Sequence, residues 1–247
     1  MSDSIIVIPT YNEKENIERM IRTILHLPKP FHILIVDDNS PDGTAAIIRK
    51  IQKKHPEQLF MLERKGKLGL GTAYLTGFRW ALEKDYQFIF EMDADFSHDP
   101  IELLNLYKAC SEEGADLAIG SRYISGINVI NWPLRRVLMS YMASKYVRMV
   151  TGMKIMDTTA GFKCYKRAVL EKLDLDRIKM KGYGFQIEMK FKTWRLGYNI
   201  MEVPIIFTDR KEGASKMSGG IFGEAFKGVI KMKIASYFSY PGKKTQK

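Results

Sequence analysis

Two aspartates that are separated by one residue closely follow a strongly apolar segment in the first half of the chain. Asp93 and Asp95 come after the run Phe88-Ile89-Phe90. Carboxylate oxygens at the end of a strand are the ligands that Mg2+ and Mn2+ prefer, and these ions take further ligands from water and from substrate phosphates. The spacing fits a metal site that holds a diphosphate. It also fits a solvated turn, because so short a motif occurs in many proteins.

Further polar groups follow other apolar runs in the same half of the chain. Asp37-Asp38 comes after the run 31–36, and Tyr11-Asn12-Glu13 comes after the run 5–8. Acidic side chains at such positions can accept hydrogen bonds from the base or the ribose of a nucleotide. A second carboxylate pair at a strand end favours the metal and nucleotide interpretation of the first pair.

Two other features near these groups have less specific interpretations. Gly69-Leu70-Gly71 precedes a predicted helix, where glycines can cradle a phosphate. The surrounding sequence matches neither the dinucleotide fingerprint nor the P-loop, so a tight turn that lets the helix pack on the sheet is favoured. His98 lies close to the aspartates, and we expect it to help cap the helix that starts at Pro100 rather than to act in catalysis.

The elements that must position these residues alternate along the first half of the chain. The hydrophobic periodicity predicts strands at 5–8, 31–36, 59–63, 88–92 and 116–120, with helices at 13–27, 41–54, 70–84 and 100–113. Such alternation with short connections is typical of an α/β fold with a mostly parallel sheet flanked by helices. Ligands of open α/β sheets bind beyond the carboxyl ends of the strands, which is where the polar groups fall.

The second half is less regular and richer in amphipathic helices. We expect helices at 133–150, 183–197 and 219–238 and a strand at about 200–207. The first and last of these helices combine an apolar stripe with Lys and Arg, a pattern that fits both a membrane interface and packing on the core. A spanning helix needs about 20 mostly apolar residues, and the sequence has no such window, so we expect a soluble or peripheral protein.

The charge is distributed unevenly over the chain. The total is +11, but residues 1–120 hold 14 basic and 19 acidic residues, whereas residues 121–247 hold 25 and 9. The basic half suits phosphate, an anionic membrane or nucleic acid. It has no zinc-finger or RNP-like aromatic signature, which disfavours nucleic acid. With only Cys110 and Cys164, neither a disulfide framework nor a structural zinc site is expected, and a reducing cytoplasm is the simplest setting.

Taken together, the motifs resemble a known enzyme family. In chain order they are Ile8-Pro9-Thr10-Tyr11-Asn12-Glu13, Val36-Asp37-Asp38-Asn39-Ser40-Pro41-Asp42-Gly43-Thr44, Gly69-Leu70-Gly71, Asp93-Ala94-Asp95 and Gly120-Ser121-Arg122-Tyr123. This order is similar to that of the inverting family 2 nucleotide-sugar glycosyltransferases, which have the GT-A fold. Within that family the likeness is greatest to the enzymes that mannosylate dolichyl or polyprenyl phosphate.

The resemblance continues through Thr159-Ala160-Gly161-Phe162-Lys163 and Gly182-Tyr183-Gly184-Phe185-Gln186 and ends in the segment 210–217. It implies a Rossmann-like GT-A catalytic domain over residues 1–218. Residues 219–247 would then form an amphipathic C-terminal helix and a basic tail, which is not an independent domain.

The resemblance also implies which residues form the site. The guanosine of GDP-mannose would contact Pro9, Tyr11, Glu13, Val36 and Asp38, and its diphosphate would contact Asp93, Ala94 and Asp95. Asp95 would be a principal ligand of Mg2+ or Mn2+, with Asp93 assisting. The phosphates of donor or acceptor would meet Arg122, Arg210 and Lys216, and Arg136 or its neighbour Arg135 would face the lipid phosphate. Family members often have Gln where this chain has Ser97, which leaves the preferred metal open.

The implied reaction transfers mannose from GDP-mannose to dolichyl or polyprenyl phosphate, on the cytoplasmic face of a membrane. The sequence leaves open a membrane-anchored partner subunit. It also leaves open another donor, such as UDP-glucose, and a polysaccharide acceptor.

Overall fold

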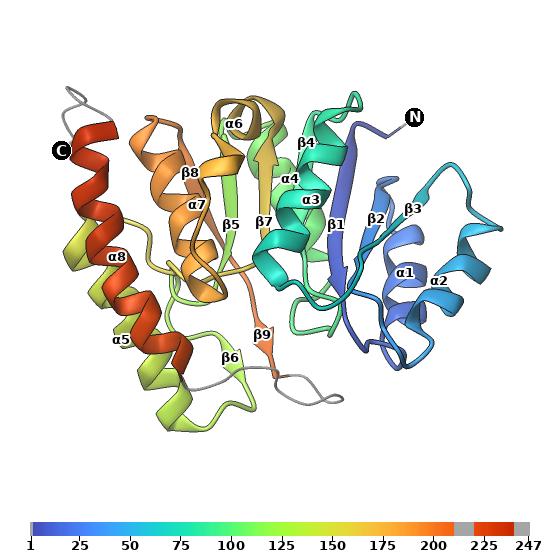
Figure 1. Cartoon of the computed structure of the whole chain (residues 1–247), viewed down its shortest axis with the longest axis horizontal. Helices are drawn as coiled ribbons and strands as arrows, with labels where there is room; N and C mark the ends of the chain where they lie inside the picture. The colour runs from blue at the N-terminus through green and yellow to red at the C-terminus, as the bar shows by residue number, and fades with distance from the viewer. Residues whose placement is uncertain (1, 210–219, 240–247) are drawn as a thin grey trace.

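The computed structural model of the chain describes residues 2–209 and 220–239 (Figure 1). Its main sheet has seven strands in the order β3-β2-β1-β4-β7-β5-β8. These are β1 (Ser4–Thr10), β2 (His32–Asp37), β3 (Leu59–Glu63), β4 (Phe88–Glu91), β5 (Leu117–Ser121), β7 (Lys163–Lys166) and β8 (Ile200–Pro204). All neighbouring pairs are parallel except that β7 runs antiparallel to both β4 and β5. The predicted α/β fold with a mostly parallel sheet is confirmed.

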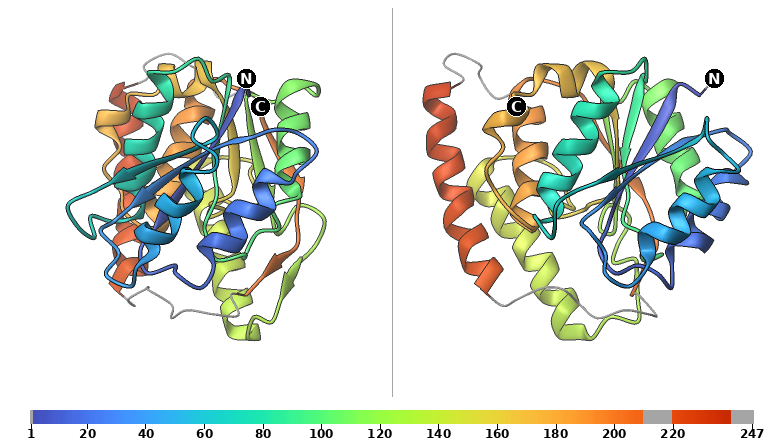
Figure 2. Two further views of the ribbon diagram at one scale, coloured as in Figure 1. Left: turned by 90° about the vertical axis from the view of Figure 1, so that its right-hand side faces the viewer. Right: turned by 45° about the vertical axis from the view of Figure 1, so that its right-hand side comes forward.

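Helices cover both faces of this sheet, and Figures 1 and 2 show the resulting layers. One face carries α1 (Ile17–Leu25), α2 (Thr44–Gln52) and α4 (Glu102–Ser111). The other carries α3 (Leu70–Leu82), α6 (Arg167–Lys172) and α7 (Tyr183–Arg195), and a short 3-10 helix spans Leu175–Arg177. At the β8 end of the sheet, α5 (Leu134–Thr151) and α8 (Gly220–Ser239) pack beside α7.

Local sequence explains why the central strands and their helices form. The residues 5–8 of β1 are fully buried, because a parallel strand with helices on both faces needs apolar side chains on both sides. Along α3, Gly71 faces Phe185, and a Cβ atom on that glycine would lie 2.9 Å from the Phe185 Cγ atom. Gly71 therefore lets α3 approach α7, whereas the sequence predicted a turn that lets this helix pack on the sheet.

The strand predicted at 200–207 is in fact two strands in two different sheets. β8 ends at Pro204, which has no N–H group to continue a ladder. The chain then turns, and β9 (Phe207–Thr208) pairs in parallel with β6 (Val129–Ile130) in a separate two-stranded sheet. This second sheet lies beyond the carboxyl end of β5, beside the region where the polar motifs gather (Figure 1).

The predicted C-terminal helix is present as α8 and packs on the rest of the protein through one face. Val229 is buried, and the ring of Phe226 stacks on Tyr146 of α5 with 3.8 Å between ring centroids. The Lys233 ammonium donates to the carbonyl oxygen of Thr151 at 2.9 Å. Across residues 2–209 and 220–239, no helix combines the length and apolarity that crossing a membrane requires.

Candidate active site

The carboxyl ends of β1, β2, β4 and β5 surround a cavity of about 440 Å3. The predicted site residues that line it are Pro9, Tyr11, Glu13, Asp38, Asp93, Ala94, Asp95, Arg122 and Arg136. Val36 belongs to β2 and does not line the cavity, because its side chain is fully buried in the hydrophobic core. Arg210 and Lys216 fall outside the described residues. The fold thus brings together motifs that are far apart in the sequence.

One side of the cavity, which we call the acidic wall, consists of Asp38, Asp93 and Asp95. Asp38 forms a nearly buried ion pair with Arg64, and it accepts the N–H of Leu68 at 3.1 Å. These contacts tie the end of β2 to the loop that precedes α3. Its neighbour Asp37 points instead into the protein, where it accepts the hydroxyl of Thr10 at 2.8 Å.

Asp93 and Asp95 each accept a hydrogen bond from a nearby residue. The Tyr74 hydroxyl donates to Asp93 at 3.0 Å, and the Ser97 N–H donates to Asp95 at 3.0 Å. Burial, together with the nearby Asp93 carboxylate, raises the pKa of Tyr74 well above its ordinary value, so this hydroxyl keeps its proton. The side chains at positions 93 and 95 face the same cavity, while Phe96 between Asp95 and Ser97 has a left-handed backbone with φ 57°.

The chemistry of this pair suits a hard cation with few protein ligands. Among the described residues, no group of three or more His, Cys, Asp or Glu side chains is placed to hold a metal ion. Two carboxylates on one cavity wall fit the way Mg2+ binds, since that ion keeps several waters and uses one or two carboxylates plus substrate phosphates. Ser97, at the position where Gln is usual, lines the cavity and is 4% exposed.

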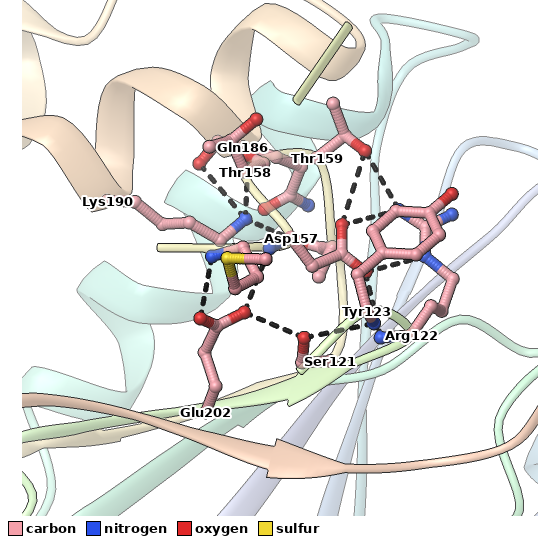
Figure 3. A network of polar contacts seen from close by, with 11 residues as sticks. Ser121, Arg122, Tyr123, Asp157, Thr158, Thr159, Gln186, Lys190 and Glu202 are labelled. Atoms are coloured by element: carbon pink, nitrogen blue, oxygen red, sulfur yellow. Dashed lines mark hydrogen bonds and ion pairs between the residues drawn. The ribbon is translucent and has the colours of Figure 1, made fainter. Parts of the chain in front are cut away.

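The opposite side, which we call the basic wall, contains Arg122 and Arg136. Arg122 follows β5 and is almost buried, and its guanidinium binds both oxygens of the fully buried Asp157 at 2.6 Å (Figure 3). Its Nη2 also donates to the Thr159 hydroxyl at 2.8 Å. In the part of the chain that the structure describes, the Arg122 Nη1 group makes no hydrogen bond.

The Arg122–Asp157 pair keeps its charges despite its burial. Desolvation alone would lower the pKa of Arg122, but the adjacent Asp157 carboxylate outweighs it and raises that pKa above its ordinary value. Desolvation would raise the pKa of Asp157, but Arg122 holds that pKa below its ordinary value. Both groups are therefore ionised at neutral pH, and a fixed positive charge lies at the cavity wall.

Arg136 lies in the first turn of α5 and is more exposed. Its Nη1 contacts both carboxylate oxygens of Asp209 at 2.9 Å, and its guanidinium lies 4.1 Å from the centre of the Trp132 ring. The same ring lies 5.4 Å from the guanidinium of Arg122, so both cations contact one indole. Arg136 lines the cavity, whereas its neighbour Arg135 does not.

The prediction that His98 helps to cap the helix after Pro100 is wrong. Its imidazole is 4% exposed and stacks on Phe162 with 4.9 Å between ring centroids. The structure shows no side-chain cap on α4, and the Asp99 carboxylate accepts the N–H of Ile101, just before that helix, at 3.0 Å. Burial lowers the pKa of His98 to about 4, so the ring is neutral at pH 7 and forms part of the cavity wall.

Sequence reasoning missed a set of buried polar residues behind the cavity. They are the buried Glu91, Asp157, Lys163, Gln186 and Lys190, together with the half-buried Glu202. Lys163 forms a fully buried ion pair with Glu91 at 3.0 Å, and the Gln186 amide donates to the other Glu91 oxygen at 3.0 Å. One signal in the sequence could have indicated these residues. Gln186 and Lys190 are four residues apart on the buried face of a helix, and buried polar side chains there need hydrogen-bond partners.

Comparison with known proteins supports an assignment to a family. Residues 5–174 match the family model described as glycosyl transferase family 2. Over 222 residues the chain is 47% identical to a polyprenol monophosphomannose synthase of Mycolicibacterium smegmatis, covering 90% of this chain and 83% of that protein. Over 230 residues it is 44% identical to an undecaprenyl-phosphate mannosyltransferase of Micrococcus luteus, covering 93% of each.

Solved structures share the fold at lower sequence identity. A glucosyl-3-phosphoglycerate synthase of Mycobacterium tuberculosis, in complex with Mn2+ and UDP-glucose, matches with a TM-score of 0.67 and 18% identity over 97% of this chain and 80% of that one. The mannosyltransferase PcManGT of Pyrobaculum calidifontis, in complex with GDP-Man and Mn2+, matches with a TM-score of 0.59 and 18% identity over 97% and 72%. The fold has the GT-A arrangement expected from the sequence, and the chain is a glycosyltransferase that belongs to glycosyl transferase family 2.

Proposed function

We propose that the enzyme transfers mannose from GDP-mannose to the phosphate of a polyprenyl or dolichyl lipid, giving a β-linked mannosyl phosphate and GDP. The observation that carries the proposal is the cavity itself, in which strand-end carboxylates face two arginines. The names of the two relatives supply the sugar and the lipid class.

The donor would occupy the acidic wall. Tyr11, Glu13 and Asp38 lie at the ends of β1 and β2, where they can meet the base and ribose of the nucleotide. Asp93 and Asp95 would hold Mg2+ or Mn2+ together with the diphosphate. When bound, the cation would neutralise the charge that develops on the departing GDP. Arg210 and Lys216 stay proposed phosphate contacts.

The acceptor would occupy the basic wall. Arg122 and Arg136 can bind a phosphate monoester, whose second pKa near 6 leaves it ionised at neutral pH. An ionised oxygen needs no general base, which suits a site whose histidine, His98, is buried and neutral. In-line attack by that oxygen on the anomeric carbon displaces GDP and inverts the configuration. The two walls then contribute mainly by placing the reactants.

We also propose that the enzyme binds the cytoplasmic face of a membrane as a peripheral protein. Leu134, Leu138 and Met142 recur along one side of α5 with exposed fractions of 72%, 53% and 55%. Arg135 and Lys145 on the same helix are also exposed. Apolar side chains among basic ones are typical of helices that lie in an anionic interface, and Arg136 on this helix would then meet a lipid headgroup.

The test is a product assay. Purified protein is incubated with Mn2+, labelled GDP-mannose and polyprenyl phosphate, and the expected product is a lipid-extractable mannosyl phosphate of the calculated mass with β configuration by NMR. EDTA should abolish the product and added Mn2+ should restore it. Transfer only from a UDP-sugar, or only to a polysaccharide, would contradict the assignment of donor or acceptor.

A further inference from the structure

A short loop behind Arg122 is held by charged groups that the proposed chemistry does not use. Residues 156–160 lie between α5 and β7 and contain Asp157, whose carboxylate binds the Arg122 guanidinium (Figure 3). Thr159 and Ala160 of this loop also line the cavity. The position of the loop therefore sets where the fixed cation of the basic wall points.

Glu202 of β8 holds the N–H groups of the loop. One of its carboxylate oxygens accepts the N–H of Met156 at 2.6 Å, and the other accepts the N–H of Asp157 at 2.8 Å. The second oxygen also accepts the hydroxyl of Ser121 at 2.7 Å. Because Ser121 directly precedes Arg122, this carboxylate ties the loop to the end of the strand that carries the arginine.

Lys190 of α7 holds the carbonyl groups of the same loop from the other side. Its ammonium is fully buried and donates to the carbonyl oxygens of Thr158 at 3.0 Å and Ala160 at 2.6 Å. Its remaining proton is directed to the carbonyl oxygen of Gln186 at 3.5 Å. The two charged groups thus bind opposite polar groups of one short loop, which restricts rotation of its peptide planes.

Stability alone is a poor explanation for the buried ammonium. Taking a charge out of water is costly, and burial lowers the pKa of Lys190 well below its ordinary value. Methionine has nearly the shape of a lysine without its terminal amine. Lys190→Met therefore removes the hydrogen bonds of this side chain while it keeps most of the packing.

We propose that Lys190 and Glu202 are positioning residues that fix the 156–160 loop, so that Asp157 keeps Arg122 aimed into the cavity. The inference rests on the proposed function, in which Arg122 binds the lipid phosphate. The proposal assigns Lys190 and Glu202 to binding of the acceptor and not of the donor. The reason is that the loop they hold contains Asp157, which binds Arg122 of the basic wall.

The test compares Lys190→Met with Thr193→Val, a matched control. Thr193 is also buried on α7, but its hydroxyl donates to Met189 of its own helix at 2.8 Å and not to the loop. For K190M we expect the KM for polyprenyl phosphate to rise about tenfold, since small misplacements of a binding group weaken its contribution. The KM for GDP-mannose should stay close to that of the wild type, and the melting temperature of K190M should fall, because the carbonyl oxygens of Thr158 and Ala160 lose a buried donor. T193V should leave both KM values unchanged.

A second measurement does not depend on activity. Amide hydrogen exchange of residues 156–160 should be faster in K190M than in the wild type and unchanged in T193V. Unaltered exchange together with an unaltered acceptor KM would overturn the proposal, as would a rise in both KM values by the same factor. If the wild type transfers no mannose, the proposed function fails, whereas the exchange rates still decide whether Lys190 fixes the loop.

Glu202→Gln provides the parallel test from the other side of the loop. The NH2 group that replaces one carboxylate oxygen cannot accept an N–H. The rate of amide exchange in the loop and the KM for polyprenyl phosphate should therefore rise as in K190M. If K190M is recovered unfolded, E202Q decides, and unchanged loop exchange in E202Q would then overturn the positioning role.

Discussion

The acidic and basic walls face each other across one cavity, but their charges are held in different ways. Asp93 and Asp95 accept hydrogen bonds from a tyrosine hydroxyl and a backbone N–H close by. Arg122 and Arg136 are each paired with a carboxylate from a distant part of the chain, Asp157 and Asp209. Asp38 of the acidic wall is also ion-paired, with Arg64, so Asp93 and Asp95 are the carboxylates to which the proposed function assigns the cation.

The two pairs of the basic wall differ from each other as well. The Arg122 and Asp157 side chains are 6% and 0% exposed, whereas those of Arg136 and Asp209 are 37% and 26% exposed. A buried pair is costly to break, because the remaining charge loses its partner in a poorly solvated place, whereas an exposed pair contributes little. We infer that Arg122 is a fixed part of the wall and that Arg136 can exchange Asp209 for an incoming phosphate.

The largest expected effect lies in the acidic wall. Asp95→Ala should lower kcat by about 10³-fold while leaving the fold intact, because stabilisation of the leaving diphosphate is lost. The product assay measures the activity, and the melting temperature reports the fold. Asp85→Asn, an exposed change far from the cavity, is the control. Substantial residual transfer by D95A would remove Asp95 from its proposed metal-binding role.

The next effect tests the difference between the two ion pairs. Asp157→Asn should lower the free energy of unfolding by about 3–5 kcal/mol because it leaves Arg122 buried without a charged partner. Asp209→Asn should lower it by less than about 1 kcal/mol. Urea unfolding at pH 7 measures both. Similar losses for the two variants would contradict the distinction between a fixed and an exchangeable arginine.

The same pair gives a pH dependence with a defined sign. The folded pKa of Asp157 lies below its ordinary value of 3.8, so its stabilisation is present above that value and is lost as the pH falls through the lower folded pKa. D157N should lack this loss of stability in acid. Parallel pH profiles for the wild type and the variant would show that the pair does not contribute.

The smallest effect concerns the exchangeable arginine. Arg136→Ala should raise the KM for polyprenyl phosphate by about tenfold, the value of one charge-assisted hydrogen bond, with a smaller change for GDP-mannose. Arg135→Ala is the matched control, since that neighbour is exposed and does not line the cavity. A larger effect on the donor than on the acceptor would place the acceptor phosphate elsewhere.

The contrast between the walls also explains what could be predicted from the sequence. The acidic wall follows apolar strands directly, so Asp38, Asp93 and Asp95 were predictable from hydrophobic runs and the rule for strand ends. The carboxylate partners of the two arginines were not predictable from such a rule. Asp157, for example, lies 35 residues from Arg122 in the sequence. The antiparallel direction of β7 was equally hidden, since a four-residue strand with lysine at both ends has no signal for its orientation.

The position of β7 has a consequence for how the enzyme is made. Strand β4, which leads to the acidic wall, and strand β5, which leads to the basic wall, do not pair with each other, and β7 joins them. While residues 163–166 are still inside the ribosome, β4 has an open edge and β5 lacks both of its neighbours, because β8 follows β7 in the chain. The cavity is also lined by Phe207, so the nascent chain cannot complete it until most of the chain has been synthesised.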